Sequence, residues 1–97
     1  MEKEKQLRML KCISDETRLK ILKVLKNGER CVNEIMEELN TEQSLVSHHL
    51  QGMRKCGLVL SRREGKNVMY KLADKSVIKL LADIDKLSVK FCSGNAR

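Results

Sequence analysis

Aromatic side chains are almost absent from this sequence of 97 residues, which contains one tyrosine, one phenylalanine and no tryptophan. Proteins that bind single-stranded nucleic acids stack the bases on several aromatic side chains. The scarcity of such side chains argues against that function. It also predicts a hydrophobic core built from leucine, isoleucine, valine and methionine.

Long apolar segments are also missing. The N-terminus, MEKEKQLR, is charged, and no run approaches the roughly 18 apolar residues that a membrane span needs. We therefore expect no secretory signal, no membrane partner and a cytoplasmic location. In a reducing cytoplasm, cysteines are expected to be thiols or ligands rather than structural disulfides. The sequence has four of them, at Cys12, Cys31, Cys56 and Cys92.

The sequence motifs of common enzymes are missing as well. There is no glycine-rich phosphate loop, no His-x-x-x-His or Cys-x-x-Cys metal motif, and no recognisable catalytic spacing of cysteine and histidine. The pattern also gives no sign of a deep apolar pocket for a small-molecule substrate. We therefore expect a protein that is not an enzyme.

Basic charge is concentrated in one part of the chain, whose formal net charge is +7. Residues 41–72 carry six lysines and arginines against two glutamates, whereas residues 29–40 carry one arginine against four glutamates. A focused basic region suggests a polyanionic partner. A solvated lysine surface without a partner is the alternative that charge alone leaves open.

The most informative stretch covers residues 41–70 and reads TEQSLVSHHLQGMRKCGLVLSRREGKNVMY. Val46, Leu50 and Met53 form an apolar stripe at helical spacing, Thr41 suits the N-cap, and Gly57 suits the C-terminal stop. The opposite face of this helix carries polar side chains that match the hydrogen-bonding edges of DNA bases. These side chains are Gln43, Ser44, Ser47, His48, Gln51 and Lys55.

A basic hairpin follows this helix. Residues 58–72 alternate as two strands, and Arg62, Arg63 and Lys66 crowd around a turn at Gly65. A helix followed by a hairpin with a basic tip is the recognition half of a winged helix-turn-helix.

The rest of the chain completes the same fold. Further helices are predicted over residues 2–13, after a cap at Ser14 or Asp15, after a cap at Asn33, and over residues 75–92 after a cap at Asp74 or Ser76. With a minor strand at residues 29–31, the order is α-α-β-α-α-β-β-α. This order predicts an α+β, mainly α winged helix-turn-helix in one domain of residues 1–97, whose last five residues, SGNAR, are expected to fray.

The two terminal helices, residues 2–13 and 75–92, both carry apolar stripes that a small winged core cannot bury. We expect them to serve as dimerisation helices that pack against their copies across a two-fold axis. Two recognition helices would then enter successive major grooves, about one helical turn of DNA apart.

Four segments, in this order, resemble the ArsR/SmtB family of bacterial and archaeal winged-helix repressors. They are SDETRLKILKVL, NGERCVNEIMEEL, QSLVSHHLQGMRKCGLV and RREGKNVMYKL. The resemblance covers roughly residues 7–92. It implies a homodimeric repressor that binds an inverted repeat of double-stranded DNA and leaves it when an effector binds. By the family pattern, the major-groove residues are Gln43, Ser44, Ser47, His48 and Gln51, and the wing residues are Arg62, Arg63 and Lys66. His49 lies beside Val46, Leu50 and Met53 in the helical pattern and is expected to be a partly buried structural residue, with a phosphate contact or a ligand role as the alternative.

Neither familiar metal site of the family is complete in this chain. Arsenite sensors carry Cys-x-Cys where this sequence has Cys31-Val32-Asn33. Zinc and cobalt sensors carry carboxylate and histidine pairs along the last helix, where a single carboxylate, Asp74, matches. Metal sensing by those two routes is therefore in doubt.

The cysteines leave other effector sites open. Cys12 and Cys92 lie at the ends of the terminal helices and could meet within or across subunits, with Cys31 as a third thiolate. Such a site would bind a soft ion such as arsenite, cadmium or copper(I), or form a regulatory disulfide. The alternative is that Cys12 and Cys92 are small interface hydrophobes. Cys56, beside the helix-ending Gly57, is expected to be structural.

Two other functions are left open by the sequence. One is a winged-helix regulator that binds DNA constitutively or responds to a partner protein. The other is an interaction module without DNA function, which the polar helix face and the basic wing argue against.

Overall fold

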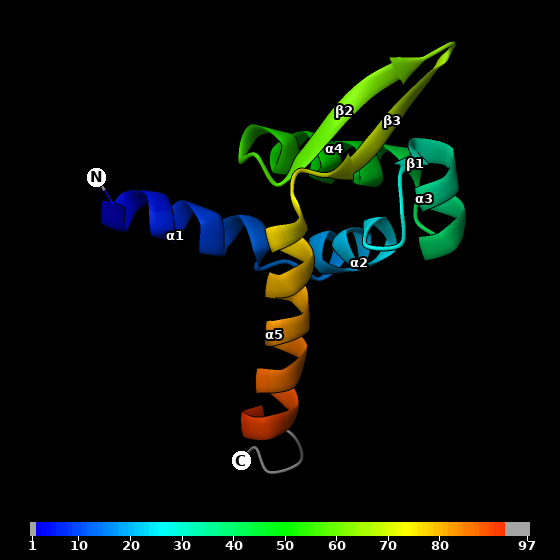
Figure 1. Ribbon diagram of the computed structural model, residues 1–97. Coiled ribbons are helices and arrows are strands. Elements are labelled where there is room, and N and C mark those ends of the chain that lie inside the picture. Colours follow the sequence, from blue (N-terminus) through cyan, green and yellow to red (C-terminus); the bar gives the residue numbers. More distant parts are fainter. Residues whose placement is uncertain (1, 93–97) are drawn as a thin grey trace.

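The computed structural model describes residues 2–92, so the C-terminal residues expected to fray lie outside the described part of the chain. Its helices and strands follow one another in the predicted order (Figure 1). They are α1 (Glu2–Ile13), α2 (Glu16–Leu25), β1 (Arg30–Cys31), α3 (Val32–Leu39), α4 (Gln43–Lys55), β2 (Val59–Glu64), β3 (Asn67–Leu72) and α5 (Lys75–Cys92). Among these helices, none has the length and apolar character needed to cross a bilayer.

The sheet is small and antiparallel, with strand order β1-β3-β2. Strands β2 and β3 pair from Val59 opposite Leu72 to Glu64 opposite Asn67. Gly65 turns the chain between them with φ +63°, a conformation that glycine adopts without steric cost. The resulting hairpin, the wing, projects from the helical body (Figure 1).

The core is aliphatic, as the composition predicts. Ile21 and Leu22 of α2 pack against the stripe on α4, and all of these side chains are fully buried. That stripe is the predicted one, formed by Val46, Leu50 and Met53. Burial of each such side chain stabilises the fold by about 1.5–3 kcal/mol. The core therefore holds α4 by one face and leaves the other face toward solvent.

Helix ends show which local predictions were correct. Asp15 caps α2, and its carboxylate accepts a hydrogen bond from the Arg18 backbone N–H at 3.0 Å. Asp74 does the same for the Ser76 N–H at the start of α5. Gly57, just after α4, has φ +83°, as expected of a residue that stops a helix.

Two predicted caps are wrong. Helix α4 begins one residue later than expected, and the Thr41 hydroxyl donates to the Leu39 carbonyl at 3.0 Å, which holds the turn instead of the helix. Asn33 lies inside α3, because the Cys31 N–H is already satisfied by the Glu34 carboxylate at 2.9 Å. At α3 the Glu34 carboxylate thus takes part in the capping, whereas Glu42, the N-cap residue of α4, makes no side-chain capping bond.

Arg18 joins three helices through one guanidinium group. Its Nε donates to Nδ1 of His49 on α4 at 2.9 Å, and its Nη1 donates to the Cys12 carbonyl of α1 at 3.3 Å. His49 is 9% exposed, in agreement with its predicted place on the buried side. Its Nε2 lies 3.7 Å from the Asp15 carboxylate. A buried polar group that lacks its hydrogen bond costs free energy. Because the bonds of Arg18 form only when α1, α2 and α4 are correctly placed, Arg18 determines how these three helices meet.

Gly52 makes room for this guanidinium. A Cβ atom added at position 52 would overlap the terminal nitrogen Nη2 of Arg18. The Arg18 side chain cannot move aside freely, since its other nitrogens are bonded to His49 and Cys12. The absence of a side chain at position 52 is therefore a packing requirement.

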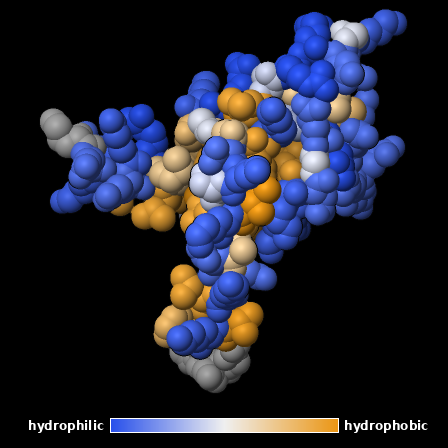
Figure 2. Space-filling view, viewed as in Figure 1, coloured by the Kyte–Doolittle hydropathy of each residue, from blue (hydrophilic) through white to orange (hydrophobic). Residues whose placement is uncertain are grey.

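The two terminal helices extend away from the body in different directions (Figure 1). Cys12 is the buried residue of α1, and Val77 and Leu81 are those of α5. Apolar side chains remain on the surface of both helices (Figure 2). They are Leu7, Met9 and Leu10 on α1, and Ile78, Leu80, Leu87, Val89 and Phe91 on α5.

We predict that Gly52→Ala destabilises the fold by about 1–3 kcal/mol, because the new methyl group displaces the Arg18 guanidinium. Urea unfolding followed by circular dichroism measures this change. In an unobstructed helix the same substitution would stabilise by about 0.5–1 kcal/mol. Gln51→Ala, at the exposed neighbouring position, is the control and should change stability little. A more stable Gly52→Ala protein would contradict the packing requirement.

Acidification should weaken the fold partly through His49. Burial holds the pKa of His49 below its ordinary value of 6.5. At a pH between the lowered pKa of His49 in the folded chain and its value of 6.5 in the unfolded chain, the unfolded chain binds more protons. The stability that neutral His49 contributes to the fold is therefore complete above about pH 6.5 and is lost as the pH falls. The urea midpoint should decrease from about pH 7.5 to 5.5, and decrease less in His49→Gln, whose amide oxygen accepts the Arg18 bond without titrating. Equal decreases in both proteins would show that His49 is not responsible.

Candidate nucleic-acid interface

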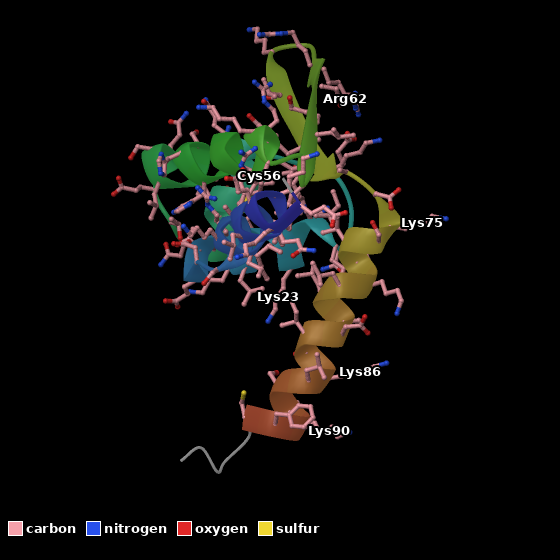
Figure 3. All side chains as sticks on the ribbon, turned by 90° about the vertical axis from the view of Figure 1, so that its left-hand side faces the viewer. Lys23, Cys56, Arg62, Lys75, Lys86 and Lys90 are labelled. Carbon is pink, nitrogen blue, oxygen red and sulfur yellow. The ribbon has the colours of Figure 1, made fainter. Side chains whose placement is uncertain are left out.

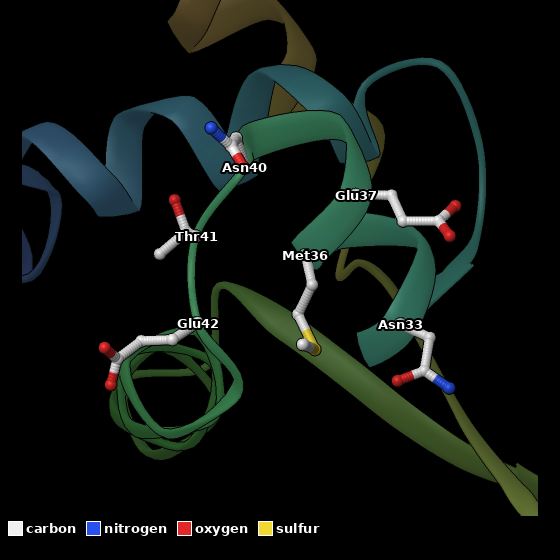
Figure 4. Close-up of a pocket in the computed structure, with 6 residues that line it drawn as sticks. All are labelled: Asn33, Met36, Glu37, Asn40, Thr41 and Glu42. Carbon is white, nitrogen blue, oxygen red and sulfur yellow. The ribbon is translucent and has the colours of Figure 1, made fainter.

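Helices α3 and α4 form a helix-turn-helix. Asn40 has φ +50° and reverses the chain, and Thr41 and Glu42 lead into α4 (Figure 4). A pocket of about 500 Å³ opens at this turn, and Met36 and Glu37 line it together with the turn residues. Carboxylates at Glu37 and Glu42 make the pocket a poor site for phosphate. The turn therefore positions α4 and is not itself suited to hold an anion.

The polar face of α4 points to solvent as predicted. Ser47 is partly buried, and the other predicted members of this face, Gln43, Ser44, His48, Gln51 and Lys55, are exposed. The Ser44 hydroxyl donates to the Glu42 carboxylate at 2.8 Å, so its proton is engaged at the start of the helix. The face as a whole presents donors and acceptors of the kind that can pair with base edges in a major groove.

Two further residues of α4 border this surface and were missed by sequence reasoning. Leu45 is 40% exposed, and an apolar side chain at the edge of such a face is of the kind that can contact a thymine methyl group. Its position, one residue before the buried Val46, was a usable signal, since successive helical residues point about 100° apart. Arg54 donates to the Ser61 hydroxyl at 3.2 Å and thereby links α4 to β2.

The three basic residues predicted for the wing divide into two groups. Arg62 donates to both carboxylate oxygens of Glu29, at 2.7 and 2.8 Å, and Figure 3 labels it on the wing. These hydrogen bonds hold the pKa of Glu29 below its ordinary value of 4.5. Arg62 thus anchors β2 to the segment before β1. Within the described part of the chain, Arg63 and Lys66 are exposed and enter no ion pair, so their charges stay available.

A crevice of about 190 Å³ brings the start of α4 and the tip of the wing together. Gln43 of α4 and Lys66 of the wing line it, along with Cys31 of β1 and Asn33 of α3. Residues that sequence reasoning placed on separate elements therefore border one continuous surface.

The three cysteines proposed as an effector site do not converge within one chain. Cys31 lines the crevice beside the wing, and Cys92 is exposed at the end of α5. The thiol of Cys12 is buried and donates to the Gly52 carbonyl of α4 at 3.9 Å. Across residues 2–92, no three histidine, cysteine or acidic side chains gather at a position suited to a metal ion.

The partly buried Cys56 packs against the core cluster that contains Cys12. Burial and the neighbouring Cys56 thiol raise the pKa of Cys12 to about 11, while the Arg18 guanidinium acts in the opposite direction. No local sequence signal marks this packing, because Cys12 lies on α1 and Cys56 follows α4, and the tertiary fold brings the two segments together.

Comparisons with known proteins agree with this architecture. The family model described as "Bacterial regulatory protein, arsR family" matches residues 15–61. An uncharacterized HTH-type transcriptional regulator of Methanocaldococcus jannaschii is 42% identical over 89 residues, which cover 90% of this chain and 100% of that protein. The transcriptional repressor SmtB of Mycobacterium tuberculosis is 33% identical over 77% of this chain, which spans 56% of that protein's length.

A solved structure shares the whole fold. The homodimeric winged helix-turn-helix DNA-binding domain of a possible ArsR-family regulator from Mycobacterium bovis has a TM-score of 0.86 and 29% sequence identity. The similarity covers 97% of this chain and 87% of that one. Together with the helix-turn-helix and wing described above, these relationships show that the chain belongs to the ArsR family of winged helix-turn-helix transcriptional regulators.

Proposed function

We propose that the protein is a homodimeric transcriptional repressor that binds an inverted repeat of double-stranded DNA. The observation that carries this proposal is the crevice at which Gln43 of α4 and Lys66 of the wing meet. It supports a single surface on which the helix reads bases and the wing holds the backbone. Occupation of an operator by such a dimer would block transcription from an overlapping promoter.

The two parts of this surface have different roles. Ser47, His48 and Gln51 would contact base edges and provide sequence preference. Arg63 and Lys66 would lie over phosphates, where they raise affinity for any sequence. Arg62 would act differently from the other wing residues, since its bidentate pair with Glu29 supports a role in fixing the angle of the wing.

The terminal helices would form the dimer interface. Leu10 is 62% exposed on α1, and Phe91 is 69% exposed on α5. Exposed apolar side chains along two projecting helices favour burial against a second copy of the same chain. A two-fold arrangement would also present two copies of α4 to one face of the DNA.

Release from the operator would depend on an effector that acts on thiols. The residues proposed for this role are Cys12, Cys31 and Cys92, and the effector would be a thiophilic ion or an oxidant. Because these three cysteines are separated within one chain, assembly of the site would require the partner subunit. That separation equally supports a constitutive regulator without an effector. Operator binding measured with and without arsenite and diamide distinguishes the two.

We expect two classes of DNA-binding variant. Ser47→Ala should weaken binding to the protein's own upstream DNA by about 1–3 kcal/mol and leave binding to scrambled DNA unchanged, since it loses a base contact. Lys66→Ala should weaken both and reduce the slope of log affinity against log salt by about one. Fluorescence anisotropy at several salt concentrations measures both quantities.

Lys23→Ala is the matched control for Lys66→Ala, because it removes the same charge from the side of the body opposite the wing (Figure 3). It should leave the salt slope nearly unchanged. If Ser47→Ala retained full preference for the upstream DNA, the proposed reading of bases by α4 would be wrong.

Leu87→Gln should weaken dimerisation roughly tenfold, because it puts a polar group where the proposed dimer would bury an apolar side chain. Leu87 is 53% exposed in the single chain, which makes it available to a partner. Sedimentation equilibrium measures the dissociation constant. Lys86→Gln, a substitution at the adjacent exposed residue, is the control and should have little effect. An unchanged dimer in Leu87→Gln would exclude this part of α5 from the interface.

A further inference from the structure

An open cavity of about 530 Å³ lies at the base of the wing. The end of α2, the segment before β1, the strands of the wing and the start of α5 all border it. On β2, Ser61 accepts a hydrogen bond from Arg54 of α4, so the next side chain, Arg62, points to the opposite face of the wing. The cavity includes Arg62 and is therefore separate from the crevice that Gln43 and Lys66 border.

Positive charge predominates around this cavity. Its basic lining residues come from four separate segments of the chain and are Lys26, Arg62, Lys71 and Lys75. Figure 3 labels two of them, Arg62 on the wing and Lys75 at the start of α5. Two carboxylates, those of Glu29 and Asp74, also line the cavity.

Both carboxylates are already engaged. Glu29 accepts two hydrogen bonds from Arg62, and Asp74 accepts from the backbone N–H and the hydroxyl of Ser76. Across residues 2–92, the three lysines of the cavity enter no ion pair. Like charges that line one cleft focus their potential and attract an anion.

The cavity also has an apolar part. Leu25 of α2, Leu72 of β3 and Ile78 of α5 line it together with the lysines. Ile78 is 38% exposed, so apolar surface remains open to a ligand. Cavities of about 300–1,000 Å³ that combine apolar surface with a few charged groups are typical of sites for small organic molecules. Inorganic phosphate alone would leave this apolar surface in water.

We propose that this cavity binds a small organic dianion, in which an acidic head group is joined to an apolar body. The lining residues carry four positive and two negative charges, so a head group with two negative charges balances the excess. A phosphate monoester and a dicarboxylate both have this charge at neutral pH. The ammonium groups of Lys71 and Lys75 donate to the head group, and Ile78 contacts the body.

A bound dianion would also meet the pair that supports the wing. Arg62 and Glu29 both line the cavity, and the Arg62 side chain is 50% exposed. The head group therefore competes with Glu29 for the guanidinium donors. If the chain acts as the proposed dimeric repressor, this competition changes how the wing is held on DNA. That consequence rests on the proposed function, whereas the ligand site does not.

The test is isothermal titration of the full chain without DNA, at pH 7.5 and constant ionic strength. The probes are phenyl phosphate and benzylmalonate, which join a phosphate or a dicarboxylate head to the same kind of apolar ring. We expect at least one of them to bind at one site per chain with a dissociation constant below about 1 mM. Inorganic phosphate should bind at least about tenfold more weakly, because it lacks the apolar body.

Variants separate the two parts of the site. Lys71→Gln and Lys75→Gln should each weaken binding of the organic probe about tenfold, since each loses a donor to a charged group. Ile78→Ser should weaken the organic probe and leave inorganic phosphate unchanged. Lys86→Gln is the matched control for Lys75→Gln, because it removes the same charge from the same helix outside the cavity (Figure 3).

Three results would overturn the proposal. They are no binding of either organic probe, equal affinity for inorganic phosphate, and an equal loss of affinity in Lys86→Gln and Lys75→Gln. Circular dichroism checks that each variant is folded, and Lys75→Gln is expected to fold because Lys75 is exposed. Since the titration contains no DNA, its failure leaves the proposed operator binding intact, and failure of operator binding leaves the titration valid.

Discussion

The hydrogen bonds of the Arg18 guanidinium hold α4 in place. Apolar packing fixes which face of α4 is buried, but it is non-directional and tolerates small rotations and slides. The bond from Arg18 Nε to His49 at 2.9 Å and the close approach to Gly52 define one position along the helix. The bond to the Cys12 carbonyl ties the end of α1 to the same point. If α4 reads bases as proposed, it needs such definition, because base contacts depend on atomic positions held to a fraction of an ångström.

The basic charge of the chain is used in two ways. Arg62 is neutralised by Glu29 and supports the wing, whereas Arg63 and Lys66 remain available to an anionic partner. A count of basic residues treats these three alike. Arg62 differs from the other two because it meets the carboxylate of Glu29. Glu29 precedes β1, and the antiparallel pairing of β1 with β3 brings it beside the wing. Net charge therefore indicates the class of partner, and ion pairing decides which residues can meet it.

Prediction from sequence succeeded where the signal is local and repetitive. The stripe of Val46, Leu50 and Met53, the stop at Gly57 and the capping of α2 by Asp15 all follow from helical periodicity or from the chemistry of one turn. The cap proposed at Thr41 failed because its hydroxyl bonds back to the Leu39 carbonyl and α4 starts one residue later, at Gln43. The cap proposed at Asn33 failed because α3 already starts at Val32, where the Glu34 carboxylate accepts from the Cys31 N–H.

The sequence by itself determined the order of elements, the aliphatic core, the polar face of α4 and the family to which the chain belongs. All of these depend on patterns that repeat within a few residues. Only the tertiary structure decided that the Cys12 thiol meets the Gly52 carbonyl, that Arg18 requires Gly52, and that Glu29 engages Arg62. Each of these contacts joins residues far apart in the chain. Their geometry is set by how helices and strands pack against one another, and hydrophobic periodicity carries no information about it.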